Sequence, residues 1–396
     1  MRGNGQSSRV LFVVPEDWFF WTHRRALARY LVERGCAVAV ACRVNSHRER
    51  IESLGVEVLP LKLTRGGRNP AREIGAVVEI ARIIERYSPD LLHLTTVKPV
   101  LYGGLAAIVA TECRVVCAVP GLGLVYVSDA PSYRLLRFAL TGAYKVVSRL
   151  LGQRAHFVFE NPEDRDFFVQ ARIVPAERAS VILGMGCDVS EFQFAPEPEL
   201  NPPVLMMLGR LLWSKGVGEL VHAGRILADR GVSCRVVLVG APDHENPDAV
   251  PEACLRKWSD EGVAEWAGPT DRPAAVMRQC NVHVLPTKYG EGLPKALIEA
   301  AATGRASVTT DVRGCREIVL HGTTGFLVRP GDSVGLADAI EVLLRDRSLR
   351  KQMGASARAL VEQRFADSHV ISETMSVYRS LGFFIQPSDA SAIANP

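Results

Sequence analysis

The segment 281-NVHVLPTKYGEGLPKALIEAAATG-304 contains, in order, a short apolar strand, a turn with two glycines and an apolar helix. Its first five residues alternate in the manner of a strand. Gly290 and Gly292 make the turn flexible. Pro294 takes the first helical position, where its missing N–H group costs nothing, and Gly304 suits the end of the helix. A strand that leads directly into a helix is the repeating unit of a parallel sheet covered by helices.

The same alternation extends in both directions from this segment. The sequence predicts strands at 9–14, 37–42, 56–59, 90–94, 114–119, 155–159 and 179–182, and again at 204–209, 235–240, 263–267, 281–286, 306–310 and 325–328. It predicts helices at 22–34, 70–87, 97–111, 132–152 and 162–170, then at 216–230, 251–260, 271–279, 294–303, 333–346 and about 349–384. This succession indicates parallel sheets.

The Asn-Pro-Pro sequence at 201–203 separates two runs of the pattern, and 396 residues are more than one ordinary α/β domain holds. We predict an α/β fold with two doubly wound, Rossmann-like domains that face a central cleft. The first domain is expected at 1–195 and the second at 196–365. A helix at 366–385 is expected to pack back on the first domain, and 386–396 to form a mobile tail. Ligands of such sheets bind at the carboxyl ends of the strands.

The composition is that of a globular protein, with 47% hydrophobic and 23% charged residues. The charge is uneven, because residues 1–155 contain 22 Lys and Arg against 12 Asp and Glu, whereas the remainder contains 25 against 31. A basic first half suits an anionic lipid surface or a pyrophosphate-bearing acceptor. Nucleic acid is a weaker candidate, because the chain has no basic-plus-aromatic nucleic-acid motif.

The nine cysteines show no CxxC spacing, and most lie in apolar runs. This usage predicts reduced, buried thiols in a cytosolic protein. The apolar run at 9–14 is followed by Pro15 and Glu16, which indicates a strand and not a secretory signal. No stretch of about 18 uncharged apolar residues is present, so we expect no transmembrane helix.

Two carboxylates flank the turn of the 281–304 segment. Glu291 lies in the turn, and Glu299 lies five residues past Pro294, about 7.5 Å along the helix axis. A helix N-terminus offers free N–H groups and a positive dipole end, which suit phosphate. The two carboxylates could therefore hold a sugar and a ribose on either side of a diphosphate, which predicts a nucleotide-sugar site. The alternative is a pair of solvated helix carboxylates.

A second segment, 204-VLMMLGRLLWSKG-216, places two cations after a buried strand. The strand ends at Gly209, Arg210 follows at once, and Lys215 precedes the next helix. Cations at the carboxyl end of a strand can neutralise a departing diphosphate, Arg210 as a planar fork and Lys215 as a compact charge. An ordinary basic loop is the alternative for this segment taken alone.

Together, GRLLWSKG and EGLPKALIEA resemble the motifs of family four of the retaining glycosyltransferases. GLGLVYVS, FENPEDRDFF, GMGCDVSEF and TTDVRGCREIVLHGTTGFLV resemble that family as well. HLTTVKPVLYGGLAA is similar, more narrowly, to members that build bacterial polysaccharides on a polyprenyl-diphosphate carrier. The resemblance covers residues 9–380. It implies the GT-B architecture, with an N-terminal acceptor-binding domain and a C-terminal donor-binding domain.

The resemblance also implies roles for residues of the second domain. Arg210 and Lys215 would hold the diphosphate and stabilise it as a leaving group. Glu291 would contact the donor sugar, and Glu299 would bind the ribose. The other expected donor-binding residues are Gly209, Gly268, Pro269, Thr270, Gly292, Leu293, Pro294 and Lys295. No cofactor and no metal is expected, because the two cations take a metal's place and no spacing of His, Cys or Asp indicates a ligand set.

In the first domain, the resemblance implies that His93 is catalytic and faces the cleft near the reacting sugar. His93 belongs to the end of the strand predicted at 90–94, and a purely structural histidine is the alternative. The same resemblance places a further set of residues on the acceptor side of the cleft. These residues are His23, Arg24, Lys98, Gly121, Gly123 and Asn161.

Two stretches of the first domain suggest an acceptor or lipid surface. The aromatic run 18-WFFW-21 stands where many relatives carry a glycine pair, so the diphosphate contact of that loop is in doubt. These aromatic side chains either line an acceptor surface or belong to the core. The segment 132–154 contains only basic charges among apolar residues, which is typical of a membrane-surface helix. A core helix with a solvated basic face is the alternative.

The expected reaction moves a hexose or N-acetylhexosamine from a UDP-sugar to a polyprenyl-diphosphate-linked saccharide, with retention at the anomeric carbon. No carboxylate is an obvious nucleophile, so the enzyme would act by stabilising charge and by positioning its substrates. The expected location is the cytoplasm, at the inner face of the cytoplasmic membrane, with peripheral contact through the basic first half. The alternatives are a UDP-sugar 2-epimerase of the same architecture and a non-catalytic sugar-nucleotide-binding scaffold.

Overall fold

The computed structural model describes residues 7–63, 70–127 and 131–385, and the chain divides into two compact units. Unit 1 comprises Met1–Gly186 and Asp367–Pro396, and unit 2 comprises Cys187–Ala366. Each unit contains one parallel sheet with helices on its faces. The predicted α/β fold with two doubly wound domains is therefore confirmed. The predicted tail at 386–396 lies outside the described residues.

The first boundary falls at 186/187, whereas the sequence prediction placed it at 195/196. The segment that connects the two units is bound to unit 2 through its backbone carbonyl groups. Arg358 donates to the carbonyl oxygen of Phe192 at 2.7 Å, and Arg305 donates to that of Ala195 at 2.9 Å. Because these donors come from distant parts of the chain, the sequence pattern gives no sign of where the connection joins unit 2.

Unit 1 has a seven-stranded sheet in the order β3-β2-β1-β4-β5-β6-β7. Its strands are β1 (Arg9–Glu16), β2 (Ala37–Arg43), β3 (Val56–Pro60), β4 (Leu91–Thr95), β5 (Arg114–Val119), β6 (Ala155–Phe159) and β7 (Ala179–Val181). Its helices are α1 (Asp17–His23), α2 (Arg25–Val32), α3 (Arg48–Glu52), α4 (Pro70–Tyr87), the π-helical turn η1 (Pro99–Gly103), α5 (Gly104–Ala110), α6 (Leu124–Val127), α7 (Pro131–Leu151), α8 (Pro162–Gln170) and α16 (Asp367–Ser380), with short 3₁₀ turns at Gly152–Arg154 and Ala176–Arg178.

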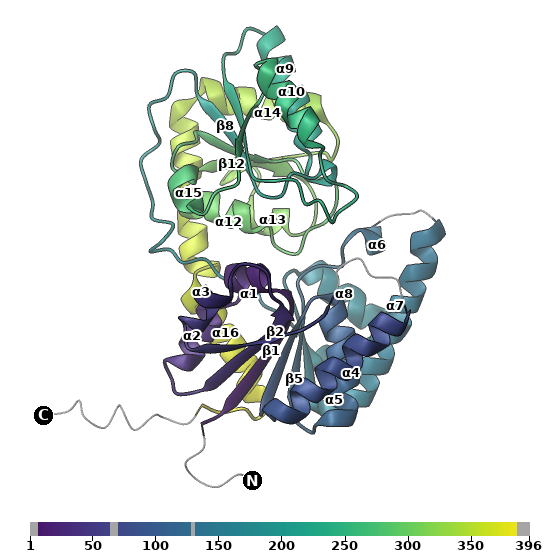
Figure 1. Cartoon of the computed structure of the whole chain (residues 1–396). Helices are drawn as coiled ribbons and strands as arrows, with labels where there is room; N and C mark the ends of the chain where they lie inside the picture. The colour runs from purple at the N-terminus through teal and green to yellow at the C-terminus, as the bar shows by residue number, and fades with distance from the viewer. Residues whose placement is uncertain (1–6, 64–69, 128–130, 386–396) are drawn as a thin grey trace, which may run out of the picture. The chain divides into compact units, whose positions relative to one another are not determined.

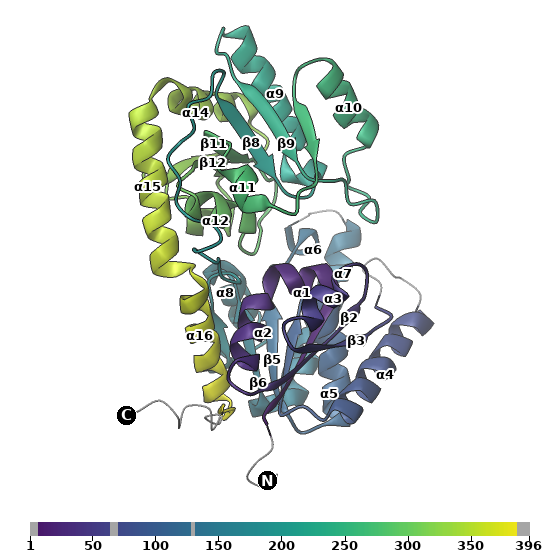
Figure 2. The same cartoon turned by 60° about the vertical axis from the view of Figure 1, so that its left-hand side comes forward.

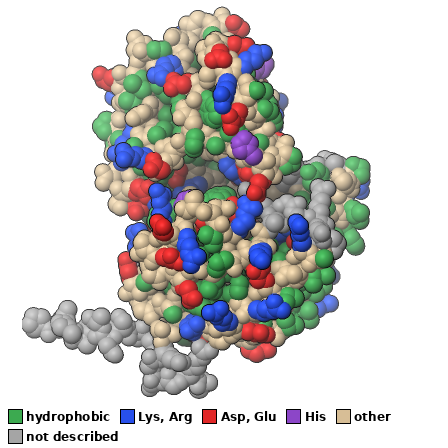
Figure 3. All heavy atoms as spheres, in the orientation of Figure 1, with side chains coloured by type: hydrophobic (Ala, Val, Ile, Leu, Met, Phe, Trp, Pro, Cys, Tyr) green, Lys and Arg blue, Asp and Glu red, His purple; other side chains and the backbone are tan. Residues whose placement is uncertain are grey.

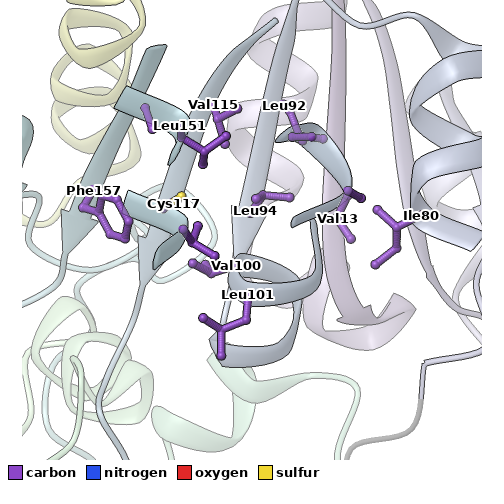
Figure 4. Close-up of a cluster of buried hydrophobic side chains, with 14 of the residues drawn as sticks. Val13, Ile80, Leu92, Leu94, Val100, Leu101, Val115, Cys117, Leu151 and Phe157 are labelled. Carbon is purple, nitrogen blue, oxygen red and sulfur yellow. The ribbon is translucent and has the colours of Figure 1, made fainter. Parts of the chain in front are cut away.

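Alternate residues of the unit-1 strands supply two apolar clusters. On one face, Leu94 and Val115 pack with Ile80 of α4 and Leu151 of α7 (Figure 4). On the other face, residues such as Phe12 pack with α2 and with α16, which Figure 2 shows in yellow beside the unit-1 sheet. Each fully buried side chain of this size contributes roughly 1.5–3 kcal/mol to folding. The helix that follows unit 2 in the sequence is therefore part of the core of unit 1.

The aromatic run after β1 is divided between core and surface. Phe20 is fully buried and makes an edge-to-face contact with Phe12, with 5.5 Å between the ring centroids. Trp18, Phe19 and Trp21 are half-buried. The core alternative therefore holds for Phe20, and the other three rings are partly open to solvent.

Unit 2 has a six-stranded sheet in the order β10-β9-β8-β11-β12-β13. Its strands are β8 (Val204–Leu208), β9 (Arg235–Val239), β10 (Glu265–Gly268), β11 (Val282–Leu285), β12 (Ala306–Thr310) and β13 (Gly325–Val328). Its helices are the 3₁₀ turn η4 (Trp213–Lys215), α9 (Val217–Asp229), α10 (Glu252–Asp260), α11 (Pro273–Met277), α12 (Lys295–Ala302), α13 (Cys315–Ile318), α14 (Ser333–Arg345) and α15 (Arg347–Arg364).

Both sheets contain a point where the strand order reverses. In unit 1 the reversal lies between β1 and β4, and in unit 2 it lies between β8 and β11. The loops that leave two such strands diverge to opposite faces of the sheet, so a crevice opens at their carboxyl ends, and ligands of this fold bind there. Figure 1 shows β8 and β12 of unit 2 with α9 and α14 beside them.

None of the helices in the described ranges is both long and apolar enough to cross a membrane. All nine cysteines are free, and most are buried.

Candidate functional site

The loops that follow β8 and β11 lie side by side at the switch point of unit 2. The backbone N–H of Lys288 donates to the carbonyl oxygen of Ser214 at 2.8 Å. Gly216 has a φ of +83°, and a Cβ atom there would lie 2.0 Å from the carbonyl oxygen of Pro286. Only glycine allows this approach, so the two loops that carry the predicted catalytic residues are fixed against each other by their backbones.

The structure brings Lys215 and Glu291 together as an ion pair between Nζ and Oε1. Both side chains are largely buried, 15% and 13% exposed. The hydroxyl of Thr287 donates to the same carboxylate oxygen at 3.0 Å. The predicted phosphate-binding cation and the predicted sugar-binding carboxylate therefore neutralise each other. A diphosphate that attracts Lys215 would release Glu291 to accept hydrogen bonds from hydroxyl groups.

Arg210 forms a second ion pair at the carboxyl end of the unit-2 strands. Its Nη1 atom lies 3.0 Å from Oδ2 of Asp243. Asp243 lies in the loop after β9, 33 positions further along the chain, so no local pattern indicates this partner. The Arg210 side chain is 41% exposed. The Asp243 side chain is 12% exposed, so the pair lies at the surface on the Arg210 side only.

The helix after the turn begins one residue later than predicted. Pro294 has an extended backbone (φ −67°, ψ 107°) and precedes α12, so it is the N-cap and not the first helical residue. Glu299 is 4% exposed, and its Oε1 lies 3.0 Å from Nζ of Lys295, one turn earlier. The helix ends at Ala302, and Gly304 follows with a φ of +79°. The predicted stop is therefore present, and the predicted start is wrong by one residue.

The remaining predicted donor-binding residues lie in the same group of loops. Gly209 follows β8, and a Cβ atom at Gly240 would lie 1.8 Å from its carbonyl oxygen. Gly268 ends β10 and accepts a hydrogen bond from the N–H of Gly240 at 2.8 Å. Pro269 and Thr270 follow Gly268, and Gly292 and Leu293 lie in the turn before α12, where Leu293 is buried.

In unit 1, His93 is part of β4 and is buried, with 3% exposure. Its register partner on β1 is Phe12, and the two rings lie 5.2 Å apart between centroids. Its Nδ1 atom lies 2.6 Å from the hydroxyl of Tyr378 on α16. Burial, together with the charge of Arg24, holds the pKa of His93 well below its ordinary value, so the imidazole is neutral. His93 is therefore the middle residue of β4 and does not follow its end. Its partner Tyr378 could not be predicted from the local sequence pattern.

His93 and Arg24 line one recess, and all of its lining residues belong to unit 1. We call it the unit-1 recess. Glu160, which directly follows β6, and Thr374 of α16 also line it. Neither residue was predicted, because a single Glu or Thr at a strand or helix position carries no local signal.

The other predicted acceptor-side residues have different surroundings. His23 ends α1, and its ring stacks on that of Phe19 at 4.2 Å. Lys98 forms an ion pair with Glu73 of α4 at 2.9 Å. Asn161 caps α8 and accepts a hydrogen bond from the N–H of Asp164 at 2.8 Å. Gly121 and Gly123 lie between β5 and α6, and Gly123 has a φ of +67°.

Helix α7, predicted as a basic amphipathic helix, presents apolar side chains to solvent. Phe138 is 81% exposed and Leu135 is 73% exposed, whereas Tyr144 and Val147 are buried against the sheet. No acidic residue occurs within Pro131–Leu151. The neighbouring helices α4 and α5 add further exposed apolar side chains. We call the exposed apolar side chains of α4, α5 and α7 together the apolar surface. Its members are Ile74, Val78, Val109, Leu135, Leu136, Phe138, Val146 and Leu150. Figure 3 shows hydrophobic side chains beside Lys and Arg on unit 1.

Two family comparisons match the chain. Residues 9–152 match the family described as glycosyl transferase 4-like, and residues 202–346 match the family described as glycosyl transferases group 1. The first match lies within unit 1 and the second within unit 2. Together they include the loops of both switch points.

Comparison with individual proteins extends this likeness over most of the chain. The chain is 26% identical over 361 residues to the N,N'-diacetylbacillosaminyl-diphospho-undecaprenol alpha-1,3-N-acetylgalactosaminyltransferase of Campylobacter jejuni, covering 88% of this chain and 93% of that protein. The structure of Alr3699/HepE of Anabaena in complex with UDP and glucose has a TM-score of 0.76 at 20% identity, covering 94% of this chain and 99% of that one. A sucrose-phosphate synthase of Thermosynechococcus elongatus has a TM-score of 0.76 at 18% identity, covering 95% and 99%. The solved structures show the GT-B fold.

Proposed function

Because this chain is a family-four glycosyltransferase, with a glycosyl transferase 4-like domain at 9–152 and a glycosyl transferases group 1 domain at 202–346, we propose that it transfers a sugar from a UDP-sugar to a polyprenyl-diphosphate-linked saccharide. The sugar is a hexose or N-acetylhexosamine, and the anomeric configuration is retained. The observation that carries the proposal is the ion pair of Lys215 with Glu291 at the unit-2 switch point, with Arg210 in the loop after β8 and Glu299 on helix α12, which follows the Glu291 turn.

On the donor side, each charged group has a task that its position supports. Arg210 and Lys215 bind the diphosphate, which displaces their present partners Asp243 and Glu291. The freed Glu291 carboxylate then accepts hydrogen bonds from hydroxyls of the donor sugar. The buried Glu299 accepts hydrogen bonds from the ribose, because a largely desolvated carboxylate binds hydroxyl donors strongly. The complex of HepE with UDP and glucose supports a UDP-linked donor.

In the transfer step, the bond from the anomeric carbon to the phosphate oxygen breaks, and a bond to the acceptor oxygen forms on the same face of the sugar. The proton of the acceptor hydroxyl passes to the leaving phosphate oxygen. Negative charge grows on that phosphate as the bond lengthens, and the Arg210 and Lys215 cations stabilise it more in the transition state than in the ground state. We propose that this pair supplies the charge for which some transferases use a metal.

On the acceptor side, the name of the Campylobacter relative supports a saccharide linked through a diphosphate to a polyprenol. Such an acceptor lies at a membrane, and the apolar surface of α4, α5 and α7 fits a lipid bilayer with anionic headgroups. Its exposed apolar side chains can enter the interface while the basic residues of α7 contact phosphate. We propose that unit 1 binds the inner face of the cytoplasmic membrane through this surface.

A screen of nucleotide-sugars against lipid-diphosphate acceptors tests the function. The protein is incubated with UDP-hexoses and UDP-N-acetylhexosamines in the presence of chelator, each with polyprenyl-diphosphate-linked mono- and disaccharides, and mass spectrometry detects the product. We expect one donor to extend one acceptor by one sugar, with the anomeric configuration of the donor preserved in the NMR spectrum of the product. An epimer formed from the donor alone, or inversion in the product, would contradict the proposal.

Binding to vesicles tests the membrane contact separately. We expect the protein to bind vesicles rich in phosphatidylglycerol and to bind those of phosphatidylcholine weakly, with binding reduced by salt. Replacing Leu135 and Phe138 together by serine is expected to weaken binding by about tenfold or more, because each large side chain contributes roughly 1.5–3 kcal/mol when buried. Serine at Val334 and Val342, two exposed valines of α14 in unit 2, is the matched control. Equal binding by both double variants would contradict the contact.

A further inference from the structure

The loop at 241–250 connects β9 to α10 (Figure 2) and is bound to the segment 210–215, which carries both predicted leaving-group cations. The N–H of Leu211 donates to the carbonyl oxygen of Ala241 at 3.0 Å. The N–H of Val250, at the other end of the loop, donates to the carbonyl oxygen of Leu211 at 3.0 Å. Both ends of the loop are therefore attached to one residue of that segment.

Asp248 of this loop holds the residue that precedes Lys215. One carboxylate oxygen of Asp248 accepts hydrogen bonds from the N–H of Ser214, at 3.0 Å, and from the Ser214 hydroxyl group. The carbonyl oxygen of Asp248 accepts a further hydrogen bond from the N–H of Trp213 at 2.9 Å. Hydrogen bonds to a charged carboxylate are the stronger kind. They fix the 3₁₀ turn η4, whose last residue is Lys215.

Ser214 also connects this turn to the loop that carries Glu291. Its carbonyl oxygen accepts a hydrogen bond from the N–H of Lys288 at 2.8 Å. The N–H and the hydroxyl of Ser214 thus bind Asp248, and its carbonyl binds the loop after β11. Because Lys215 forms its ion pair with Glu291 from this turn, a displacement of Ser214 would move the Lys215 ammonium group.

A second aspartate joins Asp248 in contacting this segment. Asp243 forms the ion pair with Arg210, and Asn246 connects the two aspartates. The N–H of Asn246 donates to the carbonyl oxygen of Asp243 at 2.7 Å, and its side-chain oxygen accepts from the N–H of Asp248 at 3.0 Å. One short turn therefore contacts the chain at both predicted cation positions.

We propose that Asp248 is a positioning residue for the transfer reaction. By holding Ser214, it fixes η4 in the geometry from which the Lys215 ammonium group reaches the diphosphate. Asp248 acts through the backbone of η4 and not on a reacting atom. A misplacement of about 1 Å can lower a rate by about 100-fold, so the rigidity of this turn bears directly on turnover. That Lys215 stabilises a leaving diphosphate rests on the proposed function, whereas its positioning by Asp248 does not.

Two substitutions at position 248 separate the hydrogen bonds from the rest of the side chain. Asp248→Ala removes the acceptor of the Ser214 bonds, and we expect kcat to fall by about 10–100-fold while the Kd for UDP changes by less than about threefold. Asp248→Asn keeps an oxygen that can accept from Ser214, so its kcat should remain within about threefold of the wild-type value. The rates are measured with the substrates that the screen identifies.

A double-mutant cycle shows whether the effect passes through Lys215. In the Lys215→Met background, Asp248→Ala is expected to lower kcat by no more than about twofold, because the group that Asp248 positions is gone. A general loss of stability would instead lower kcat by the same factor in both backgrounds.

The Lys215 side chain provides a readout that requires no substrate. In the protein labelled with ¹³C-lysine, the Lys215 signals are assigned by their loss in Lys215→Met. We expect two distinct Hε protons in the wild type and in Asp248→Asn, because the ion pair with Glu291 holds the side chain in one conformation, and averaged Hε protons in Asp248→Ala. Asp188→Ala is the matched control. Asp188, also in unit 2, accepts from the N–H of Ser190 at 2.9 Å and from its hydroxyl at 2.5 Å, and its replacement should leave the Lys215 signals unchanged.

The proposal is overturned if Asp248→Ala keeps wild-type turnover or wild-type Lys215 signals. A kcat of Asp248→Asn as low as that of Asp248→Ala, or an equal loss in the wild-type and Lys215→Met backgrounds, would overturn it as well. If the Lys215 signals change as expected but the wild-type protein transfers no sugar, the proposed function is refuted and the positioning of Lys215 by Asp248 stands.

Discussion

Replacing Lys215 by methionine is expected to lower kcat by roughly 10²–10³-fold, because one preorganised donor to a developing oxyanion contributes about that much. The effect should fall on kcat more than on KM. The Lys215 cation is paired with Glu291, so part of its attraction for the ground-state diphosphate is offset by the loss of that ion pair. Methionine keeps most of the volume of the largely buried side chain. The rates are measured with the donor and acceptor that the screen identifies.

Lys288→Met is the matched control for this variant. Lys288 lies in the same loop as Glu291 and forms its own ion pair, with Glu219 at 2.7 Å, but its side chain is 42% exposed and has no predicted contact with the donor. Its kcat should remain within about twofold of the wild-type value. A Lys215→Met enzyme with wild-type turnover would show that the cation at the switch point does not stabilise the leaving group.

Replacing Glu299 by glutamine is expected to weaken the binding of UDP by roughly 10–100-fold. A hydrogen bond to a charged group contributes about 1.5–3 kcal/mol, and each 1.4 kcal/mol is about tenfold in Kd. Glutamine keeps the shape of the buried side chain, but it removes the charge and the ion pair with Lys295. Titration calorimetry with UDP alone measures the effect, since UDP contains the ribose and neither the sugar nor the acceptor has to be known.

Glu219→Gln is the control, because Glu219 is also a largely buried carboxylate paired with a lysine, on α9 of the same unit. Its Kd for UDP should equal that of the wild type. Were Glu299→Gln to bind UDP as tightly as the wild type, the ribose assignment would be wrong, and Glu299 would serve only to hold Lys295.

Much of the fold could be predicted from the sequence because parallel strands are buried on both faces and therefore appear as short apolar runs. Every predicted strand is present, with bounds that differ by at most two residues. The short helices α3, α6 and α13 were missed because four or five residues contain too little periodicity to detect. The order of the strands within each sheet could not be predicted from local patterns either, because the pairing of β1 with β4 joins segments about 80 residues apart.

The residues of the candidate site could be predicted from the sequence. The ion pairs and hydrogen bonds that these residues form could not. Arg210, Lys215, Glu291 and Glu299 are predicted from motif and spacing, and the structure places the first three on adjoining loops and Glu299 on the helix that follows. The ion pair of Lys215 with Glu291 depends on the left-handed backbone of Gly216, which no local pattern specifies. That His93 faces the cleft stays a prediction. Its surroundings depend on its register with Phe12 and on Tyr378, which is 285 positions away in the sequence, so local reasoning does not give them.

The division of unit 1 around unit 2 has a consequence for the order in which the chain can fold. During synthesis, Cys187–Ala366 is complete before α16 has been made, whereas the core of unit 1 still lacks the α16 side chains that pack with β1 and α2. Domains usually fold as they emerge, the N-terminal one first. Here the N-terminal unit starts first and finishes last, and the Tyr378–His93 contact is among the final ones to form.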